Sequence, residues 1–277
     1  MSSRQTSNSA ASGPHSHCPE TGGLFAAVER AAAAANRTGA VGLPPLADAL
    51  RDYIDGLATE NPALTHPHAV PATQTFANAL SSYFGARLRH TSDKAKCDLP
   101  LLRMSVAAPP DPDLGTPSIH DWLEAFEATL VSRSGTCDHY LRSQFYLMYH
   151  PRLWTPDDPE PTRVPLAYAT VLAALVQRAR WPRNKQVKAT VAELLPPALE
   201  RLDQAPDDTP RTPAVRIVRR LAAGADPTPE FAAALDDAPR RRPIAWDLLA
   251  LAALAHDLKR PAAVEDTRLP TTLVTGK

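Results

Sequence analysis

The sequence predicts an all-α fold: a single helical-bundle domain with a disordered N-terminus and proline-rich linkers. In most segments the apolar residues recur at a spacing of three and four, which is the period of a buried helix face. No segment alternates apolar and polar residues over strand length with enrichment in β-branched side chains. The chain of 277 residues contains 29 prolines, so we expect helices that are interrupted often.

Composition narrows the class of protein. Lysine plus arginine and aspartate plus glutamate each total 30, so the formal net charge is +0 and nothing calls for a nucleic-acid or membrane partner. The three cysteines (Cys18, Cys97 and Cys137) are odd in number and far apart, which favours a reducing compartment over a disulfide framework. The N-terminus lacks the apolar core of a secretory signal, and the longest apolar run, residues 244–255, is too short to cross a bilayer. We expect an intracellular protein, cytoplasmic or nuclear.

The N-terminal part begins with a tail. Residues 1–22 are rich in serine, asparagine, glycine and histidine and cannot bury enough surface to offset chain entropy, so we predict disorder. An alanine-rich helix is expected over residues 24–35, ended by Gly39 and Gly42. A second helix begins at Pro45. Its apolar residues fall on one face: Leu46, Leu50, Tyr53, Ile54 and Leu57.

The middle of the chain predicts two more helices. Residues 61–71 form a loop, and the next helix carries one apolar face. Residues 91–115 contain four prolines and are expected to be an irregular crossing segment. Thr116 is expected to cap the following helix, with Pro117 at its first position. The apolar residues of the two helices are Phe76, Leu80, Tyr83, Phe84 and Leu88, then Ile119, Trp122, Leu123, Phe126 and Leu130.

The C-terminal half continues the helical pattern. Helices are expected over residues 140–148, 164–178 and 185–194. Pro196 and Pro197 are expected to break the last of these, because each proline lacks a backbone N–H, and a new helix should start at about Pro197.

Beyond Gln204 we expect two short helices, then an apolar helix over residues 244–258 and a loose end of about a dozen residues. The widest apolar stripes of the helices at 119–130 and 164–178 should meet. We therefore expect Trp122, Phe126, Leu172 and Leu175 to be buried together.

One stretch resembles a known family. The helix opening at Pro117 reads Pro-x-Ile-x-x-aromatic-Leu, with Trp122 at the aromatic position, and the next helix ends in the sequence 146–153, Tyr-Leu-Met-Tyr-His-Pro-Arg-Leu. This order resembles the start of the cyclin box in the phosphate-pathway class of fungal and protozoan cyclins. The small, apolar segment 164–178 is similar to the buried central helix of that box. The resemblance covers about residues 73–205.

The resemblance implies a fold and a function. It divides the chain into a tail (1–22), an N-terminal helical extension (23–72), a cyclin-box-like domain (73–205) and a C-terminal extension (206–277). It implies a non-catalytic regulatory subunit that uses no cofactor and binds a protein kinase, stabilising the active kinase conformation. The family's lysine and glutamate that hold the kinase correspond to Arg178 and Glu200, and arginine departs from the family's lysine.

A cysteine-dependent effector enzyme is the alternative. Cys137 follows Gly135 at a predicted helix start, where the helix N-terminus favours a thiolate. His139 or His150 could act as the base, with Asp157 orienting it. The Gly-x-Cys opening resembles transglutaminase-like proteases, but that fold carries its histidine and aspartate on strands, and only helical patterns follow here. A helical scaffold with an unrelated partner stays open as a third interpretation.

Two further patterns remain. The His-x-His pairs at 15–17 and 66–68 have no partner ligands at zinc spacing, so we predict no metal site. Residues 178–188 contain five basic side chains and Trp181 but no acid. This run could face phosphate or an acidic partner, or it could be a solvated corner between two helices.

Overall fold

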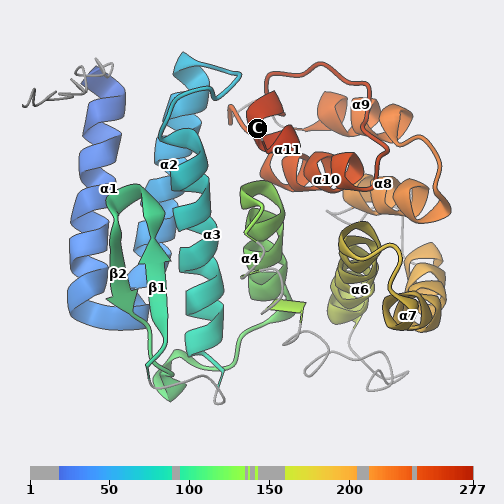
Figure 1. Ribbon diagram of the computed structural model, residues 1–277, viewed down its shortest axis with the longest axis horizontal. Helices are drawn as coiled ribbons and strands as arrows, with labels where there is room; N and C mark the ends of the chain where they lie inside the picture. Colours follow the sequence, from blue (N-terminus) through green and yellow to red (C-terminus); the bar gives the residue numbers. More distant parts are fainter. Residues whose placement is uncertain are drawn as a thin grey trace, which may run out of the picture.

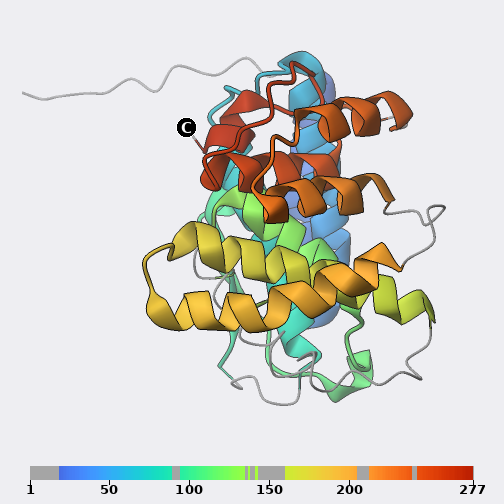
Figure 2. The same cartoon turned by 90° about the vertical axis from the view of Figure 1, so that its right-hand side faces the viewer.

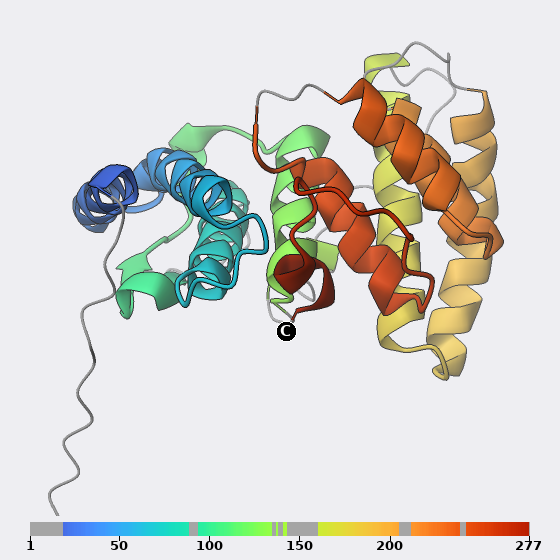
Figure 3. The same cartoon turned by 90° about the horizontal axis from the view of Figure 1, so that it is seen from above.

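The computed structural model shows a mostly helical protein in which one helix, α4, joins two groups of elements (Figures 1 and 3). On one side lie α1, α2, α3 and a β-hairpin, and on the other side lie α6 to α11. The structure describes residues 19–88, 94–134, 137, 141–142, 160–204, 212–238 and 242–276.

The N-terminal group consists of three packed helices. These are α1 (Pro19–Thr38), α2 (Leu43–Glu60) and α3 (Ala69–Ala86), with the short 3₁₀ helix η1 (Gly39–Gly42) between the first two. The five apolar residues predicted to share a face of α2 are all buried, which confirms that helix.

The predicted disorder is wrong for residues 19–22, which belong to α1. Thr21 is buried there, while Leu24 and Phe25 pack against the core. Packing of this first apolar turn explains why the helix begins ahead of its alanine-rich part, since tertiary contacts add stability that propensity alone does not supply. Residues 1–18 lie outside the described residues.

A β-hairpin occupies part of the segment predicted to be irregular. Strands β1 (Lys96–Leu99) and β2 (Met104–Ala107) pair antiparallel, with Cys97 opposite Val106, and the 3₁₀ helix η2 (Pro100–Leu102) joins them. Cys97, Leu99 and Val106 point into the core. The alternation is real but only four residues long, so the strand pattern was too short to stand out in the sequence.

Helix α4 (Ile119–Ser132) starts with a capping box at Ser118, and not with the predicted Thr116 cap and Pro117 at the first position. The Ser118 hydroxyl accepts a hydrogen bond from the Asp121 amide, and Asp121 accepts one from the Ser118 amide. This reciprocal pair satisfies two helix-end donors, so it favours Ser118 over Thr116. The 3₁₀ helix η3 (Pro112–Leu114) precedes it.

The buried stripe of α4 is confirmed. Trp122 stacks on Phe126, with ring centroids 4.4 Å apart, and its indole N–H donates to the carbonyl of Leu141 at 2.9 Å. Trp122, Phe126, Leu172 and Leu175 are all fully buried in the same continuous core, as predicted.

The C-terminal group is built around α6 (Glu160–Arg180). Every residue from Pro165 to Gln177 is buried, so this helix is covered on all sides rather than along one stripe. It contacts α4, α7 (Lys185–Asp203), α8 (Thr212–Ala223) and α10 (Trp246–Asp257). In Figure 2, α7 runs back along α6. Helix α9 (Thr228–Asp237) packs on α8 and α10.

The predicted break at Pro196-Pro197 is wrong, because α7 continues through both prolines to Asp203. The prolines free the carbonyl groups of Ala192 and Glu193, four residues earlier. All four of these residues are exposed on the outer side of α7, so water can hydrate the freed carbonyls. The cost of the missing hydrogen bonds is therefore smaller here than inside a core.

The chain end is also better anchored than predicted. Leu269 and Leu273 are buried, and the short helix α11 (Thr271–Thr275) contacts α10 and α4. Arg133, at the end of α4, is paired with Asp257 and donates to the carbonyl of Val274. These contacts fix the last described turn.

One hydrophobic core runs from Val28 to Leu273 and crosses the boundaries predicted at residues 72 and 205. Over the residues that the structure describes, no helix combines the length and the apolar character that a membrane crossing requires.

Candidate functional site

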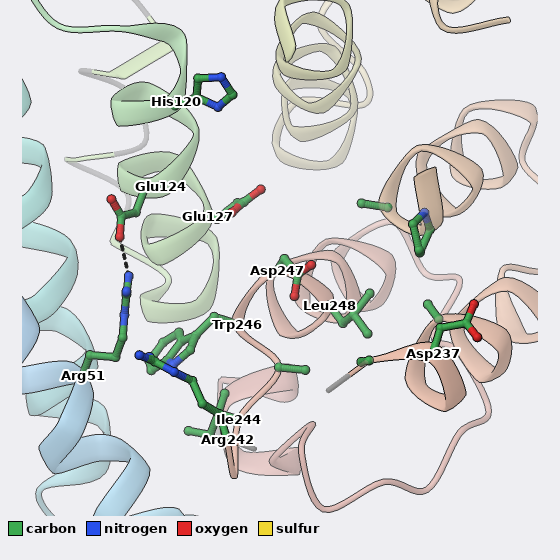
Figure 4. Close-up of a pocket in the computed structure, with 15 residues that line it drawn as sticks. Arg51, His120, Glu124, Glu127, Asp237, Arg242, Ile244, Trp246, Asp247 and Leu248 are labelled. Carbon is green, nitrogen blue, oxygen red and sulfur yellow. Dashed lines mark hydrogen bonds and ion pairs between the residues drawn. The ribbon is translucent and has the colours of Figure 1, made fainter. Parts of the chain in front are cut away.

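A cleft of about 790 Å³ lies between the two groups of helices, and we call it the interlayer cleft. Its walls come from α2, α4, α8, α9 and the start of α10 (Figure 4). Because these elements are far apart in the sequence, the cleft exists only in the folded chain. Its charged and aromatic lining residues are Arg51, His120, Glu124, Glu127, Asp237, Arg242, Trp246 and Asp247.

One wall is fixed by an ion pair and two aromatic rings. Arg51 of α2 pairs with Glu124 of α4 (Figure 4), so this contact ties the N-terminal group to the central helix. The Arg51 guanidinium carbon lies 5.2 Å from the centre of the buried Phe76 ring, and Trp246 packs on the same ring with centroids 5.1 Å apart. A cation beside an aromatic ring is attracted by the ring quadrupole, so this contact favours the position of Arg51 at the wall.

A buried carboxylate lies behind this wall. Asp55 of α2 has a side chain only 13% exposed, and its nearest cation is Arg242, at 3.9 Å. Burial raises the pKa of Asp55 from 3.8 to about 6, although Arg242, the indole N–H of Trp246 and Arg51 each lower it. Asp55 Oδ1 and Trp246 Nε1 are both buried, and neither has a hydrogen-bond partner within the described part of the chain. The indole therefore lies near the carboxylate without full hydrogen-bond geometry.

Replacing Asp55 by asparagine should flatten the pH dependence of stability. A raised pKa means that the folded protein keeps the Asp55 proton up to about pH 6, whereas the unfolded chain releases it above pH 3.8. Stability therefore falls as the pH rises through this window. We expect Asp55→Asn to be about 1–2 kcal/mol more stable than the parent at pH 7.5 and nearly equal to it at pH 4.

Urea unfolding at the two pH values measures this difference. Asp48→Asn, which neutralises an exposed carboxylate of the same helix, is the matched control and should show no such dependence. An equal effect of Asp55→Asn at both pH values would rule out the buried-carboxylate explanation.

The remaining charges of the interlayer cleft are acidic. Its lining includes four carboxylates and two guanidiniums, and each guanidinium is ion-paired, Arg51 with Glu124 and Arg242 with Asp55. Asp237 and Asp247 are exposed, and the described residues give them no ion pair. Figure 4 shows Glu127 and Asp247 reaching into the space from α4 and from the start of α10. The arrangement suits a positively charged ligand segment.

The structure does not bring Arg178 and Glu200 together as the predicted partner-binding patch. Arg178 donates to the carbonyls of Leu221, at 2.6 Å, and Ala222, at 3.2 Å, and so caps the C-terminal end of α8. Arg178 lies beside Lys188 near the start of α7, whereas Glu200 is exposed roughly 18 Å farther along that helix. The separation arises because α7 continues unbroken to Asp203 and carries Glu200 away from Arg178.

The residues of the enzyme alternative are only partly described. The Cys137 thiol donates to Asn78 Oδ1 at 3.1 Å, and Asn78 in turn donates to the carbonyl of Asp98 at 2.9 Å. Burial raises the pKa of the neighbouring Cys97 thiol to about 12. His139, His150 and Asp157 lie outside the described residues, so the predicted cysteine–histidine–aspartate arrangement stays a prediction.

Within the described ranges, no three or more histidine, cysteine, aspartate and glutamate side chains cluster closely enough to hold a metal ion. Comparison of the chain with family models, with curated proteins and with solved structures finds no match.

The sequence did not point to the interlayer cleft. The acidic residues that line the cleft are mostly isolated in the sequence. Only Glu124 and Glu127 of α4, which are three residues apart, lie on one helix face that the sequence could have indicated.

Proposed function

We propose that the protein is a non-catalytic regulatory subunit that binds a protein kinase through its helical domain. The observation that supports this most is α6, which is buried from Pro165 to Gln177 and packed by α4, α7, α8 and α10. The cyclin resemblance gives the same segment the role of the buried central helix of a cyclin box. A helix covered on every side is the structural centre that such a box needs.

The interlayer cleft is the proposed docking place of the partner. Asp237 and Asp247 supply exposed negative charge at its C-terminal side, and Ile244 and Leu248 supply apolar floor. A basic segment of the kinase fits this combination, with its charged side chains on the carboxylates and an aliphatic stem on the floor. This placement replaces the one at Arg178, whose guanidinium is used inside the fold.

Regulation then follows from differential binding. A subunit that binds the active conformation of a kinase more tightly than the inactive one shifts the population toward the active form. The kinase supplies all groups that act on phosphate, so the subunit needs only to select a conformation.

The test is kinase activity retained on immobilised protein. Full-length protein bound to beads and incubated with a lysate of the source cells should retain activity that phosphorylates a histone substrate. The double variant Asp237→Asn/Asp247→Asn should retain about one tenth of that activity, because it removes the two exposed charges without changing side-chain size. Asp48→Asn, which neutralises an exposed carboxylate of α2 outside the cleft, is the matched control.

Cys137→Ala separates the regulatory subunit from the enzyme alternative. It should leave the bead-bound kinase activity unchanged, since Cys137 contacts Asn78 and not the cleft. Loss of an activity in folded Cys137→Ala would favour the cysteine-dependent enzyme. Retained activity no greater than that of bare beads would contradict the kinase-binding proposal.

A further inference from the structure

The corner between α6 and α7 carries an exposed basic surface. Arg183, Lys185 and Lys188 are exposed there, and Arg178 lies beside them at the end of α6. Arg180, in contrast, turns toward Asp257, with a separation of 3.9 Å. We call the four residues Arg178, Arg183, Lys185 and Lys188 the basic corner.

An apolar pocket opens within the basic corner. Its volume is about 350 Å³, which is room for a large apolar side chain. Trp181 and Pro182 form one wall, and Val187, Val191 and Leu195 of α7 form the opposite one. The only charged residues in its lining are Arg178 and Lys188, and no carboxylate of the described residues lines it.

Trp181 is exposed yet held in place. Its side chain is 40% exposed, which makes it one of the few large apolar residues on the described surface. The guanidinium carbon of the buried Arg142 lies 4.6 Å from the centre of its ring. This cation–π contact fixes the plane of the indole, so the pocket wall is formed before any ligand arrives.

Positive charge accumulates at this end of the bundle. The pKa of Arg178 is lowered first by burial and second by the like charge of Arg260. Arg260 lies beside Gly224: its guanidinium nitrogen Nη2 is 3.2 Å from the position that a Cβ on Gly224 would occupy. Cations crowded in this way gain from a ligand that brings negative charge.

We propose that the basic corner docks an acidic segment of a partner protein, which inserts one large apolar side chain between Trp181 and Val191. The carboxylates of the segment pair with Arg183, Lys185 and Lys188, and the apolar side chain fills the pocket. Charge complementarity selects this occupant, because the charged residues that line the pocket in the described part of the chain, Arg178 and Lys188, are cations and disfavour basic segments. This surface is separate from the interlayer cleft and does not depend on the proposed kinase.

Fluorescence anisotropy with full-length protein tests the proposal. The probe is a labelled, glutamate-rich peptide with one central phenylalanine. We expect measurable binding at low salt, roughly tenfold weaker when the phenylalanine is alanine and undetectable when lysines replace the glutamates. Lys188→Glu should weaken binding roughly tenfold as well, since it reverses a rim charge. Equal binding of the acidic and basic peptides would overturn the proposal.

Two variants complete the design. Lys96→Glu makes the same charge reversal on exposed β1, in the N-terminal group, and should leave the peptide affinity unchanged. Trp181→Ala removes a pocket wall and should abolish the preference for phenylalanine over alanine. No binding of the acidic peptide, or equal weakening by Lys96→Glu and Lys188→Glu, would reject the site. The cleft variant Asp237→Asn/Asp247→Asn should bind the peptide with unchanged affinity. Failure of the kinase proposal can therefore be distinguished from failure of the proposed peptide site.

Discussion

Replacing Trp122 by alanine is expected to destabilise the protein by about 4 kcal/mol, the largest effect of any single substitution considered. The indole is fully buried in the first turn of α4, it stacks on Phe126, and its N–H donates to the carbonyl of Leu141. Alanine would leave a large cavity and a buried carbonyl without its donor. Urea unfolding monitored by circular dichroism measures the loss.

Trp122→Phe separates the two contributions. Phenylalanine keeps an aromatic ring beside Phe126 but cannot donate to the Leu141 carbonyl, so the expected loss is about 2 kcal/mol. A loss below about 1 kcal/mol for Trp122→Ala would show that the core collapses around the site or that Trp122 is less buried than the structure indicates.

Adding one methyl group at Gly42 is expected to destabilise the protein by about 2–3 kcal/mol. Gly42 lies where η1 turns from α1 into α2, and a Cβ built there would come 2.4 Å from the Ala35 Cα and 2.9 Å from the Ala35 amide nitrogen. These are backbone atoms, so no side-chain rotation can relieve the clash. The last turn of α1 would have to move away from α2.

Gly23→Ala is the matched comparison, with the opposite sign. A Cβ at Gly23 meets nothing within 4 Å, and the residue lies inside α1. Alanine there should stabilise the protein by about 0.5–1 kcal/mol, because glycine loses more backbone entropy in a helix. Thermal unfolding of both variants measures the difference. Similar effects of the two substitutions would contradict the close approach of η1 and α1.

The sequence predicted the helices that bury an apolar face. In α2 and α4 the burial of residues such as Tyr53 and Trp122 follows their spacing, because the helical period alone decides which side chains share a face. The predicted juxtaposition of Trp122 with Leu172 in one core also holds, since the widest stripes have the most surface to bury.

The sequence was misleading where solvent and distant contacts decide the outcome. Pro196 and Pro197 were expected to end a helix, but they sit on a face of α7 that water reaches, and sequence alone does not tell which face that is. The hairpin at 96–107 depends on its contacts with α3 and α1 rather than on a long strand pattern. In both cases tertiary contacts or solvent exposure decide the structure, and a local sequence pattern contains no information about either.

Of the candidate sites, only part of the basic corner could be foreseen. Its basic side chains and Trp181 are contiguous in the sequence, whereas the apolar wall behind them comes from the next helix. The interlayer cleft joins residues as distant as Arg51 and Asp247, so no local pattern could have revealed it.

The position of α4 limits how the chain can be divided. This helix packs on α3 at one side and on α10 and α6 at the other, so neither group of helices has a closed core without it. A cut at residue 72 would fall within α3 and separate α1 and α2 from most of that helix, and a cut at residue 205 would uncover the buried faces of α4 and α6. The protein is therefore not modular: its halves should melt in one cooperative transition, and neither half can be transplanted into another protein as an independent unit.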